Sequence, residues 1–313
     1  MDKICLVTYT RNEEYFTDEL IEIGNMLSDN HKYFKCIVFV EKKLKFSDNI
    51  KFKIEQKYME GTKYKKLIKL MEEDTSDFFI SIDNDIKGNI KKLKKFMFEI
   101  VNSDYDIGWG KIISIPEKNL ISKLVSIDKI LSHYLIRPIL WKMGIGISIP
   151  GQCFVIKRQI FNGKLLEIDT FLDDLALGLY LNINKSQISS YYSGEILGYE
   201  KPNTTFNGLL KQRSRWAEGY RTIISGVKTL KEKKLIILHG IAYHTLWIIN
   251  WGAVFSLIYF TNFWNALIYI IIIGFLITFG NVMAIGYSII YQLIFPIFHL
   301  KWLWCLIFKS RKS

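Results

Sequence analysis

The feature that most constrains this chain is its uncharged C-terminal stretch, because Leu235–Leu300 contains no Asp, Glu, Lys or Arg. A transmembrane helix needs about 20 predominantly apolar residues, so the stretch is long enough for at least two spans. The sequence therefore predicts a membrane anchor of two or three spans over residues 230–313. We expect Ile236–Phe260 and Trp264–Ile285 to cross the bilayer and Tyr287–Phe308 to lie at its interface.

Charge gives the expected orientation of this anchor. Lysines 228, 231, 233 and 234 precede the uncharged stretch, and the chain ends in KSRKS. Positive residues are retained on the cytoplasmic side of membranes, which favours two cytosolic ends and a cytoplasmic N-terminal part. The net charge is +12, but the lysines are spread along amphipathic segments without a nucleic-acid-binding motif. We expect the lipid bilayer, and no nucleic acid, as the partner of this basic surface.

Residues 1–229 show the alternation of an α/β domain. Apolar runs at Lys3–Thr8, Phe34–Val40 and Phe78–Ile82 predict strands, and amphipathic segments separate them. Such alternation indicates a largely parallel sheet with crossover helices. Ligands bind such sheets at the carboxyl ends of the strands, so polar residues directly after a strand are the candidates for function.

Asp83-Asn84-Asp85 directly follows the apolar run Phe78–Ile82. Two carboxylates one residue apart can hold a divalent cation together with substrate phosphates, which suits Mg²⁺ or Mn²⁺. The alternative is a solvated turn after an edge strand. Placement after a buried strand favours the metal-binding interpretation.

Asp173-Asp174 opens a second candidate segment, because an apolar helical pattern continues after it. A general base at this position would explain the pair. An acidic first turn, which the helix dipole stabilises, explains it as well, and both interpretations remain open on these residues alone.

The stretch LLKQRSRWAEGYRT, Leu209 to Thr222, precedes the anchor. Gln212 and Arg215 are one helical turn apart and can face one ligand, and Trp216 offers a flat apolar surface with one N–H group. Arg213 points elsewhere on the helix and is expected to contact lipid headgroups or the surface. A basic helix beside the membrane with an interfacial tryptophan is the alternative explanation.

Taken in order, DxD, Gly151-Gln152, the Asp-Asp pair and QxxRW before membrane spans resemble the membrane-integrated glycosyltransferases of family two. This group includes cellulose, chitin and hyaluronan synthases and ceramide glucosyltransferases. The resemblance covers about residues 3–220 and implies a GT-A-type nucleotide-sugar-binding domain with C-terminal transmembrane helices.

The resemblance also implies roles for individual residues. It implies catalytic roles for Asp174, as general base, and Asp173. It implies metal binding by Asp83 and Asp85, with Mg²⁺ or Mn²⁺ as cofactor. The donor and its diphosphate would be bound by Thr10, Arg11, Glu13, Glu41, Lys63, Asp83, Gln212 and Arg215. The acceptor would be bound by Gly151, Gln152 and Trp216.

The expected reaction is transfer of a sugar from a UDP-sugar, with inversion at the anomeric carbon, to a glycan at the cytosolic membrane face. Transfer of one sugar to a membrane lipid is the alternative, because two or three spans are few for a secretion channel. A catalytically silent nucleotide-sugar-binding membrane protein is the alternative from another class, and release of UDP on turnover distinguishes it. The sequence does not specify the sugar, the linkage or the acceptor.

Overall fold

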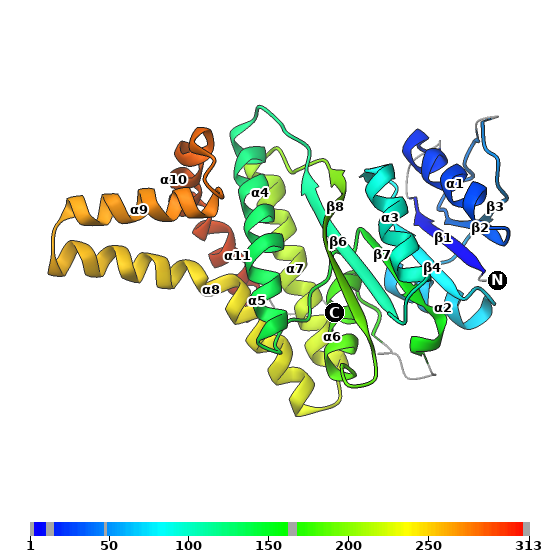
Figure 1. Cartoon of the computed structure of the whole chain (residues 1–313). Helices are drawn as coiled ribbons and strands as arrows, with labels where there is room; N and C mark the ends of the chain where they lie inside the picture. Colours follow the sequence, from blue (N-terminus) through cyan, green and yellow to red (C-terminus); the bar gives the residue numbers. More distant parts are fainter. Residues whose placement is uncertain (1–2, 11–15, 47–48, 162–167, 309–313) are drawn as a thin grey trace. The chain divides into compact units, whose positions relative to one another are not determined.

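The computed structural model describes residues 3–10, 16–46, 49–161 and 168–308. The chain, which is drawn whole in Figure 1, forms two compact units. The first unit contains Met1–Ile113 and Ser148–Lys201, and the second contains Ser114–Ile147 and Pro202–Ser313. This division follows packing. The predicted division into a catalytic part, 1–229, and an anchor, 230–313, is a division by role and stays a prediction.

One mixed sheet forms the centre of the first unit. Among the described residues its strand order is β3-β2-β1-β4-β7-β6-β8-β5. The bounds are β1 Ile4–Tyr9, β2 Phe34–Phe39, β3 Ile54–Lys57, β4 Phe78–Ile82, β5 Lys87–Gly88, β6 Ile107–Ser114, β7 Cys153–Lys157 and β8 Ser190–Glu200. β1 pairs in parallel with β2 and β4, and β2 pairs in parallel with β3, whereas β7 is antiparallel to both β4 and β6. The predicted α/β fold is confirmed, with a parallel half and an antiparallel half.

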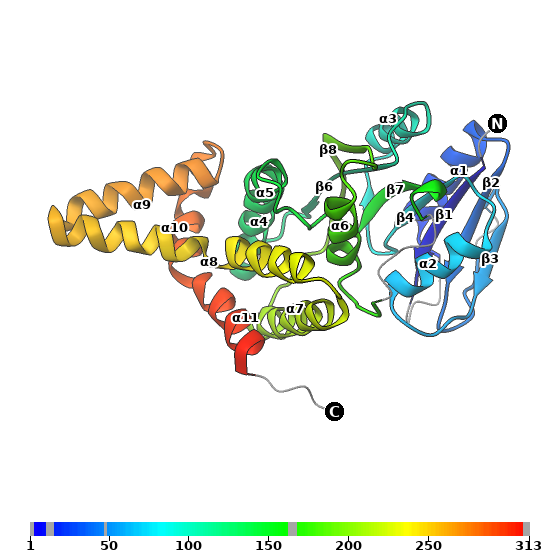
Figure 2. The same ribbon diagram turned by 90° about the horizontal axis from the view of Figure 1, so that it is seen from below.

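Helices cover both faces of this sheet (Figure 2). They are α1 Asp18–Asn30, α2 Lys63–Glu73, α3 Ile90–Val101 and α6 Asp173–Ile183, with a short 3₁₀ helix at Arg158–Phe161. Alternate strand residues such as Ile4 and Leu6 join one buried core with Leu20 of α1 and Phe96 of α3. The α2 and α6 helices contact each other on the other face (Figure 2). A strand presents alternate residues to opposite faces, so the mostly apolar β1 and β4 are strands that the sheet buries on both sides.

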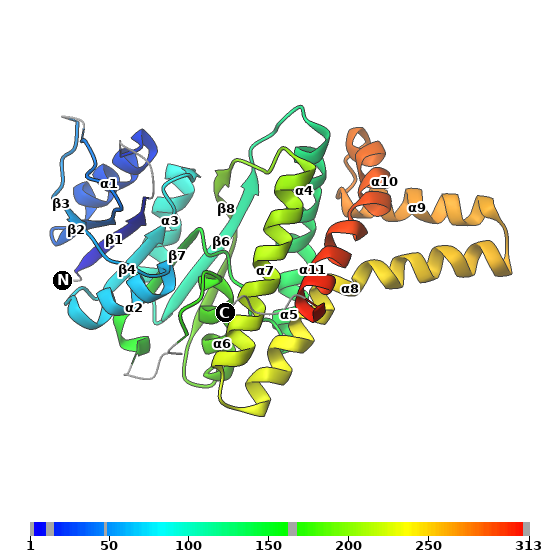
Figure 3. The ribbon, with the colours of Figure 1, turned by 180° about the vertical axis from the view of Figure 1, so that it is seen from behind.

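The second unit is helical (Figure 3). Its helices are α4 Leu120–Leu131, α5 Arg137–Lys142, α7 Phe206–Gly226, α8 Leu230–Phe260, α9 Phe263–Ile277, α10 Ile285–Ile294 and α11 Pro296–Phe308. A π-helical turn at Ser132–Ile136 joins α4 to α5, and a 3₁₀ turn at Val282–Ala284 precedes α10. The α11 helix packs along α7, while α9 packs between α8 and α10. A capping box at Thr229 and Glu232 begins α8, which fixes where the long apolar helix starts.

Among the residues that the structure describes, two helical segments are long and apolar enough to cross a membrane, Leu230–Phe260 and Val282–Phe308. The first agrees with the predicted span at Ile236–Phe260. The second predicted span, Trp264–Ile285, was wrong, because α9 ends at Ile277 after 15 residues. At 1.5 Å per residue such a helix reaches only about 22 Å, less than the hydrocarbon core. The segment expected at the interface, Tyr287–Phe308, instead belongs to the second long apolar stretch.

Candidate active site

Thr10 and Asp83, which belong to the predicted site of the first unit, directly follow the carboxyl ends of the parallel strands β1 and β4. In the register of the sheet Tyr9 of β1 lies beside Phe39 of β2, and Val7 lies beside Ser81 of β4. Thr10 therefore leaves β1 at the same edge where Asp83 leaves β4. This edge is where an open α/β sheet offers a crevice for ligands.

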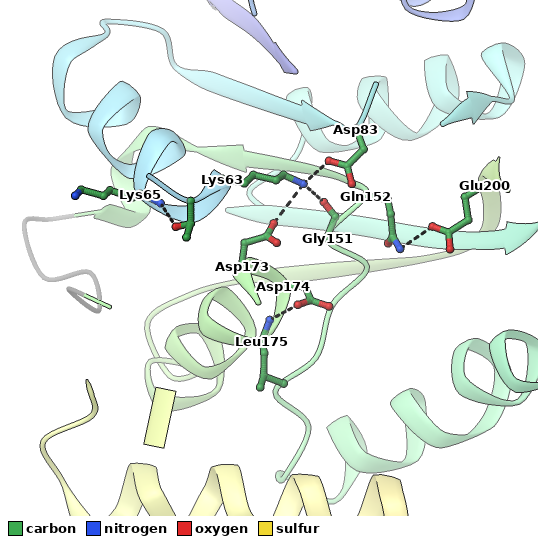
Figure 4. Close-up of polar contacts among 10 residues, drawn as sticks. Lys63, Lys65, Asp83, Gly151, Gln152, Asp173, Asp174, Leu175 and Glu200 are labelled. Atoms are coloured by element: carbon green, nitrogen blue, oxygen red, sulfur yellow. Dashed lines mark hydrogen bonds and ion pairs between the residues drawn. The ribbon is translucent and has the colours of Figure 1, made fainter. Parts of the chain in front are cut away.

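Lys63 connects the residues at this edge (Figure 4). It is the first residue of α2, whose N-cap Thr62 accepts a hydrogen bond from the Lys65 N–H group. The Lys63 Nζ atom lies 2.6 Å from Asp83 Oδ1, 2.5 Å from the Gly151 carbonyl oxygen and 3.3 Å from Asp173 Oδ2. A single ammonium group thus joins three segments that are distant in sequence.

The Gly151-Gln152 turn brings the end of β4 close to α6. The Asp83 N–H group donates to the Gln152 carbonyl at 2.9 Å. A Cβ atom on Gly151 would lie 2.9 Å from the Asp174 Cβ and 3.3 Å from Asp173 Oδ2. Only glycine permits this approach without a shift of backbone, which gives a physical reason for a glycine in the predicted motif.

Gln152 also has a partner that the sequence did not suggest. Its Nε2 group donates to Glu200 Oε2 at 2.9 Å (Figure 4). Glu200 ends β8, a strand that the sequence analysis did not predict. The pair places an oriented amide beside the Gly151 turn, where hydroxyl groups of a ligand can be bound.

The site carries more negative than positive charge. Burial raises the pKa of Asp83 to about 6, the neighbouring Lys63 opposes this rise, and Asp173 adds to it. Burial lowers the pKa of Lys63, but the carboxylates of Asp173 and Asp83 outweigh burial and the pKa is raised overall. Lys63 therefore stays charged near neutral pH, and it does not fully compensate the two carboxylates. Such an excess of negative charge favours a further cation.

Asp173 and Asp174 begin α6, in the first turn, where the helix dipole stabilises negative side chains. The two side chains have different contacts. Asp173 faces Lys63, whereas Asp174 Oδ1 accepts a hydrogen bond from the Leu175 N–H group at 2.9 Å (Figure 4). The structure therefore distinguishes two neighbouring carboxylates that the sequence alone treated as a pair.

Asp83 and Asp85 have the chemistry of a divalent-metal site shared with a substrate. The Asp83 side chain is 30% exposed, and Asp85 is exposed. Across the residues that the structure describes, no group of three or more His, Cys, Asp or Glu side chains could hold a metal ion. Carboxylate oxygens fit Mg²⁺ or Mn²⁺, which accept the rest of their ligands from phosphate and water.

Among the other residues predicted to bind the sugar donor, the structure of the first unit describes Thr10 and Glu41. The backbone N–H group and hydroxyl of buried Thr10 donate to the Phe39 carbonyl, at 2.9 and 3.4 Å. Glu41 is exposed after β2. The predicted contacts of Arg11 and Glu13 lie outside the described residues. The sequence analysis gave no role to Tyr9, whose ring centroid lies 5.1 Å from the Lys63 ammonium.

Gln212, Arg215 and Trp216 belong to α7 of the second unit, with Gln212 and Arg215 one turn apart as expected. Arg213 corrects the analysis, because it is 1% exposed and does not lie on the surface. Its Nη2 group donates to Asp128 Oδ2 at 3.0 Å, and its guanidinium carbon lies 4.2 Å from the centre of the Trp216 ring. The motif thus combines exposed Arg215 with a buried arginine that contacts the tryptophan.

No protein-family model and no curated protein sequence matches the chain. Several solved structures are similar in fold. A mannosyltransferase from Pyrobaculum calidifontis was solved with GDP-mannose and Mn²⁺. It is 13% identical, and the match covers 97% of this chain and 87% of the mannosyltransferase, with a TM-score of 0.49. A glucosyl-3-phosphoglycerate synthase from Mycobacterium tuberculosis was solved with Mn²⁺, UDP-glucose and phosphoglyceric acid. It is 14% identical, and the match covers 72% of this chain and 79% of the synthase, with a TM-score of 0.44.

A third structure, TarS from S. aureus, is 12% identical over 78% of this chain and 44% of its own, with a TM-score of 0.46. These identities are too low to carry over residue roles, and each TM-score is below 0.5.

Proposed function

We propose that this chain is an inverting, metal-dependent glycosyltransferase that moves a sugar from a UDP-sugar to a glycan acceptor at the cytosolic face of a membrane. The observation that supports it most is the convergence of Asp83, the Gly151 carbonyl and Asp173 on Lys63. This convergence lies at the ligand-binding edge of an α/β sheet, with Asp174 next in the chain.

Asp174 is the proposed general base. Its carboxylate takes the proton of an acceptor hydroxyl while that oxygen attacks the anomeric carbon of the donor. The bond from this carbon to the UDP oxygen breaks on the opposite side, so the configuration inverts and no covalent sugar–enzyme intermediate is needed. The hydrogen bond from the Leu175 N–H group to Asp174 Oδ1 is proposed to hold the carboxylate in one orientation for this step.

The leaving diphosphate needs neutralisation. Asp83 and Asp85 would hold Mg²⁺ or Mn²⁺, which supplies positive charge to the phosphate oxygens when bound. On the protein side, Arg215 and Gln212 are proposed to bind the diphosphate, because a guanidinium forms paired hydrogen bonds with phosphate. Trp216 is proposed to stack on an acceptor ring, and Gln152 to bind its hydroxyl groups.

The membrane location is also a proposal. Two helical segments have the length and composition to cross a bilayer, and lysines 228, 231, 233 and 234 precede or begin the first. We infer that Leu230–Phe260 and Val282–Phe308 both cross, so that both chain ends are cytosolic. A reporter enzyme fused after Ser313 tests this inference, and extracytoplasmic activity of the reporter would contradict it.

A lipid acceptor is the second candidate, because the second unit contains an apolar groove. The groove has a volume of about 470 Å³ and is lined by Leu210 of α7 and by α11, including Trp304 and Lys301. Apolar walls beside one lysine suit the chain and anionic headgroup of a lipid-linked substrate. A catalytically silent nucleotide-sugar binder remains the third candidate, from another functional class.

One experiment separates the three. Full-length protein in nanodiscs is offered a panel of UDP-sugars, with and without glycan and lipid acceptors, and products are identified by mass spectrometry. We expect UDP release that stops in EDTA, returns with Mg²⁺ or Mn²⁺, and depends on a glycan acceptor. Asp83→Asn should abolish it, whereas Asp29→Asn, on the exposed surface of α1, should not. A glycolipid product would favour the second candidate, and binding without turnover the third.

A further inference from the structure

The Lys63 ammonium contacts three oxygens of the protein. It donates hydrogen bonds to Asp83 Oδ1 at 2.6 Å and to the Gly151 carbonyl at 2.5 Å, and it forms an ion pair with Asp173 Oδ2 at 3.3 Å (Figure 4). An ammonium group has three donors and no acceptor. In this arrangement two of the three Lys63 donors are therefore already engaged by the protein, although the sequence suggested phosphate binding for Lys63.

The surroundings of Lys63 strengthen these contacts. Its side chain is 16% exposed, and the Tyr9 and Phe154 ring centroids lie 5.1 and 5.9 Å from the ammonium. Aromatic walls exclude water and attract a cation through the ring faces. Charge attraction is stronger in such shielded surroundings than in water, so the ammonium is held firmly between the carboxylates.

We propose that Lys63 is the resident counter-ion of the acidic site and that a divalent cation competes with it for Asp83. Asp83 Oδ1 cannot accept a close ammonium and coordinate a metal at full strength, because the two cations repel each other. Metal binding would therefore release the ammonium from Asp83 and make its donors available to the diphosphate. The inference deepens the proposed function and rests on it for the identity of the metal as Mg²⁺ or Mn²⁺.

Mn²⁺ binding in the absence of any nucleotide tests the competition directly. The full-length protein in detergent is titrated with Mn²⁺ alone by calorimetry, as wild type, Lys63→Met and Lys65→Met. Lys65 is an exposed neighbour on the same helix, so its variant is the matched control. A nearby cation changes the affinity of a carboxylate for a proton by about 10- to 1000-fold. We therefore expect Lys63→Met to bind Mn²⁺ at least about tenfold more tightly than wild type, and Lys65→Met to match wild type.

Equal or weaker Mn²⁺ binding by Lys63→Met would overturn the proposal, and so would the absence of Mn²⁺ binding in all three proteins. A second measurement uses only the wild-type protein, so it does not depend on the folding of a variant. Acetic anhydride labels free lysine amines, and mass spectrometry reads the modified fraction at each lysine. Lys63 should be protected in EDTA and several-fold more reactive at saturating Mn²⁺, with Lys65 unchanged as the internal reference. Constant or falling reactivity of Lys63 would overturn the proposal.

These measurements are independent of turnover. If the protein releases UDP from a UDP-sugar while Mn²⁺ leaves Lys63 protected, the counter-ion inference is wrong and the proposed function stands. If Mn²⁺ exposes Lys63 and binds Lys63→Met more tightly, but no donor is turned over, the inference stands and the proposed function is wrong.

Discussion

The buried pair of Arg213 and Asp128 yields the sharpest stability prediction. Their side chains are 2% and 11% exposed, and the closest oxygen and nitrogen are 3.0 Å apart. Asp128 also accepts a hydrogen bond from the Tyr291 hydroxyl at 3.0 Å. Within the described residues, the Arg213 Nε and Nη1 atoms are buried without a hydrogen-bond partner. Asp128 is thus the group that compensates a buried guanidinium.

Asp128→Asn preserves shape and can still accept from Tyr291, but it removes the negative charge. Removing one partner of a buried ion pair costs about 3–5 kcal/mol, because the other charge is left uncompensated. One charged hydrogen bond contributes about 1.5–3 kcal/mol of this, and the remainder is the burial of the free charge. The Arg213→Met/Asp128→Leu double variant should be less destabilised than Asp128→Asn, since it buries no charge at all.

Thermal unfolding in detergent, followed by circular dichroism, compares wild type, Asp128→Asn and the double variant. Glu218→Gln, on the exposed face of α7, is the control for removal of one charge and should unfold like wild type. If Asp128→Asn also unfolds like wild type, the guanidinium is hydrated and the reasoning from a buried pair fails. A double variant less stable than Asp128→Asn would refute it as well.

Three further predictions concern the first unit and the acceptor. Asp174→Asn preserves the size of the side chain but removes its ability to take a proton. Turnover should therefore fall by about 10²–10⁴-fold with UDP-sugar binding unchanged. Trp216→Ala should instead raise the apparent acceptor KM. Both are measured by initial rates and by donor titration. Gly151→Ala places a Cβ atom 2.9 Å from that of Asp174, which should displace Asp174. A displacement of this kind costs about 100-fold in rate, and the unfolding temperature should change only slightly. Hydrogen bonds from Lys35 and from the Ser76 backbone and side chain lower the pKa of Asp74 below 3.8 against the effect of burial. A lowered pKa stabilises the fold above the unfolded-state value and loses that stabilisation as pH falls through the folded value. Asp74→Asn should therefore unfold at a lower temperature than wild type at pH 7, and the difference should shrink as the pH falls through the folded-state pKa of Asp74.

Sequence predicted those strands that the sheet buries on both faces. β1, β2 and β4 are nearly continuous apolar runs, and such runs have few alternatives to a buried strand. β8 was not predicted, because SYYSGEILGYE has polar residues on both faces and its burial is irregular. Its place in the sheet depends on pairing with strands far away in the chain, which no local pattern encodes.

The same limit applies to the site. Asp83, Gly151 and Asp173 were each identified from local patterns, but their convergence on Lys63 is a property of the fold. Glu200 was missed together with β8. The burial of Arg213 could have been suspected, since Asp128 is the one carboxylate in the apolar α4 segment LISKLVSIDKIL, and a charge there needs a partner.

The error in the second span shows why apolar composition does not locate the end of a helix. α9 stops because Phe279 and Gly280 adopt φ values of 51° and 79°. The Gly280 N–H group then donates to the Phe275 carbonyl at 3.0 Å, which is the bond of a Schellman helix end. The chain reverses there, and Gln292 of α10 donates to the Ile270 carbonyl of α9 at 3.0 Å. Hydropathy is high on both sides of this turn, so an average over a window of residues does not reveal where the helix ends. The stop signal in the sequence was Gly280, because glycine is the residue that most readily ends a helix in a left-handed conformation. A helix prediction for this chain therefore needs the helix stop as well as the apolar run, because the stop limits α9 to 15 residues.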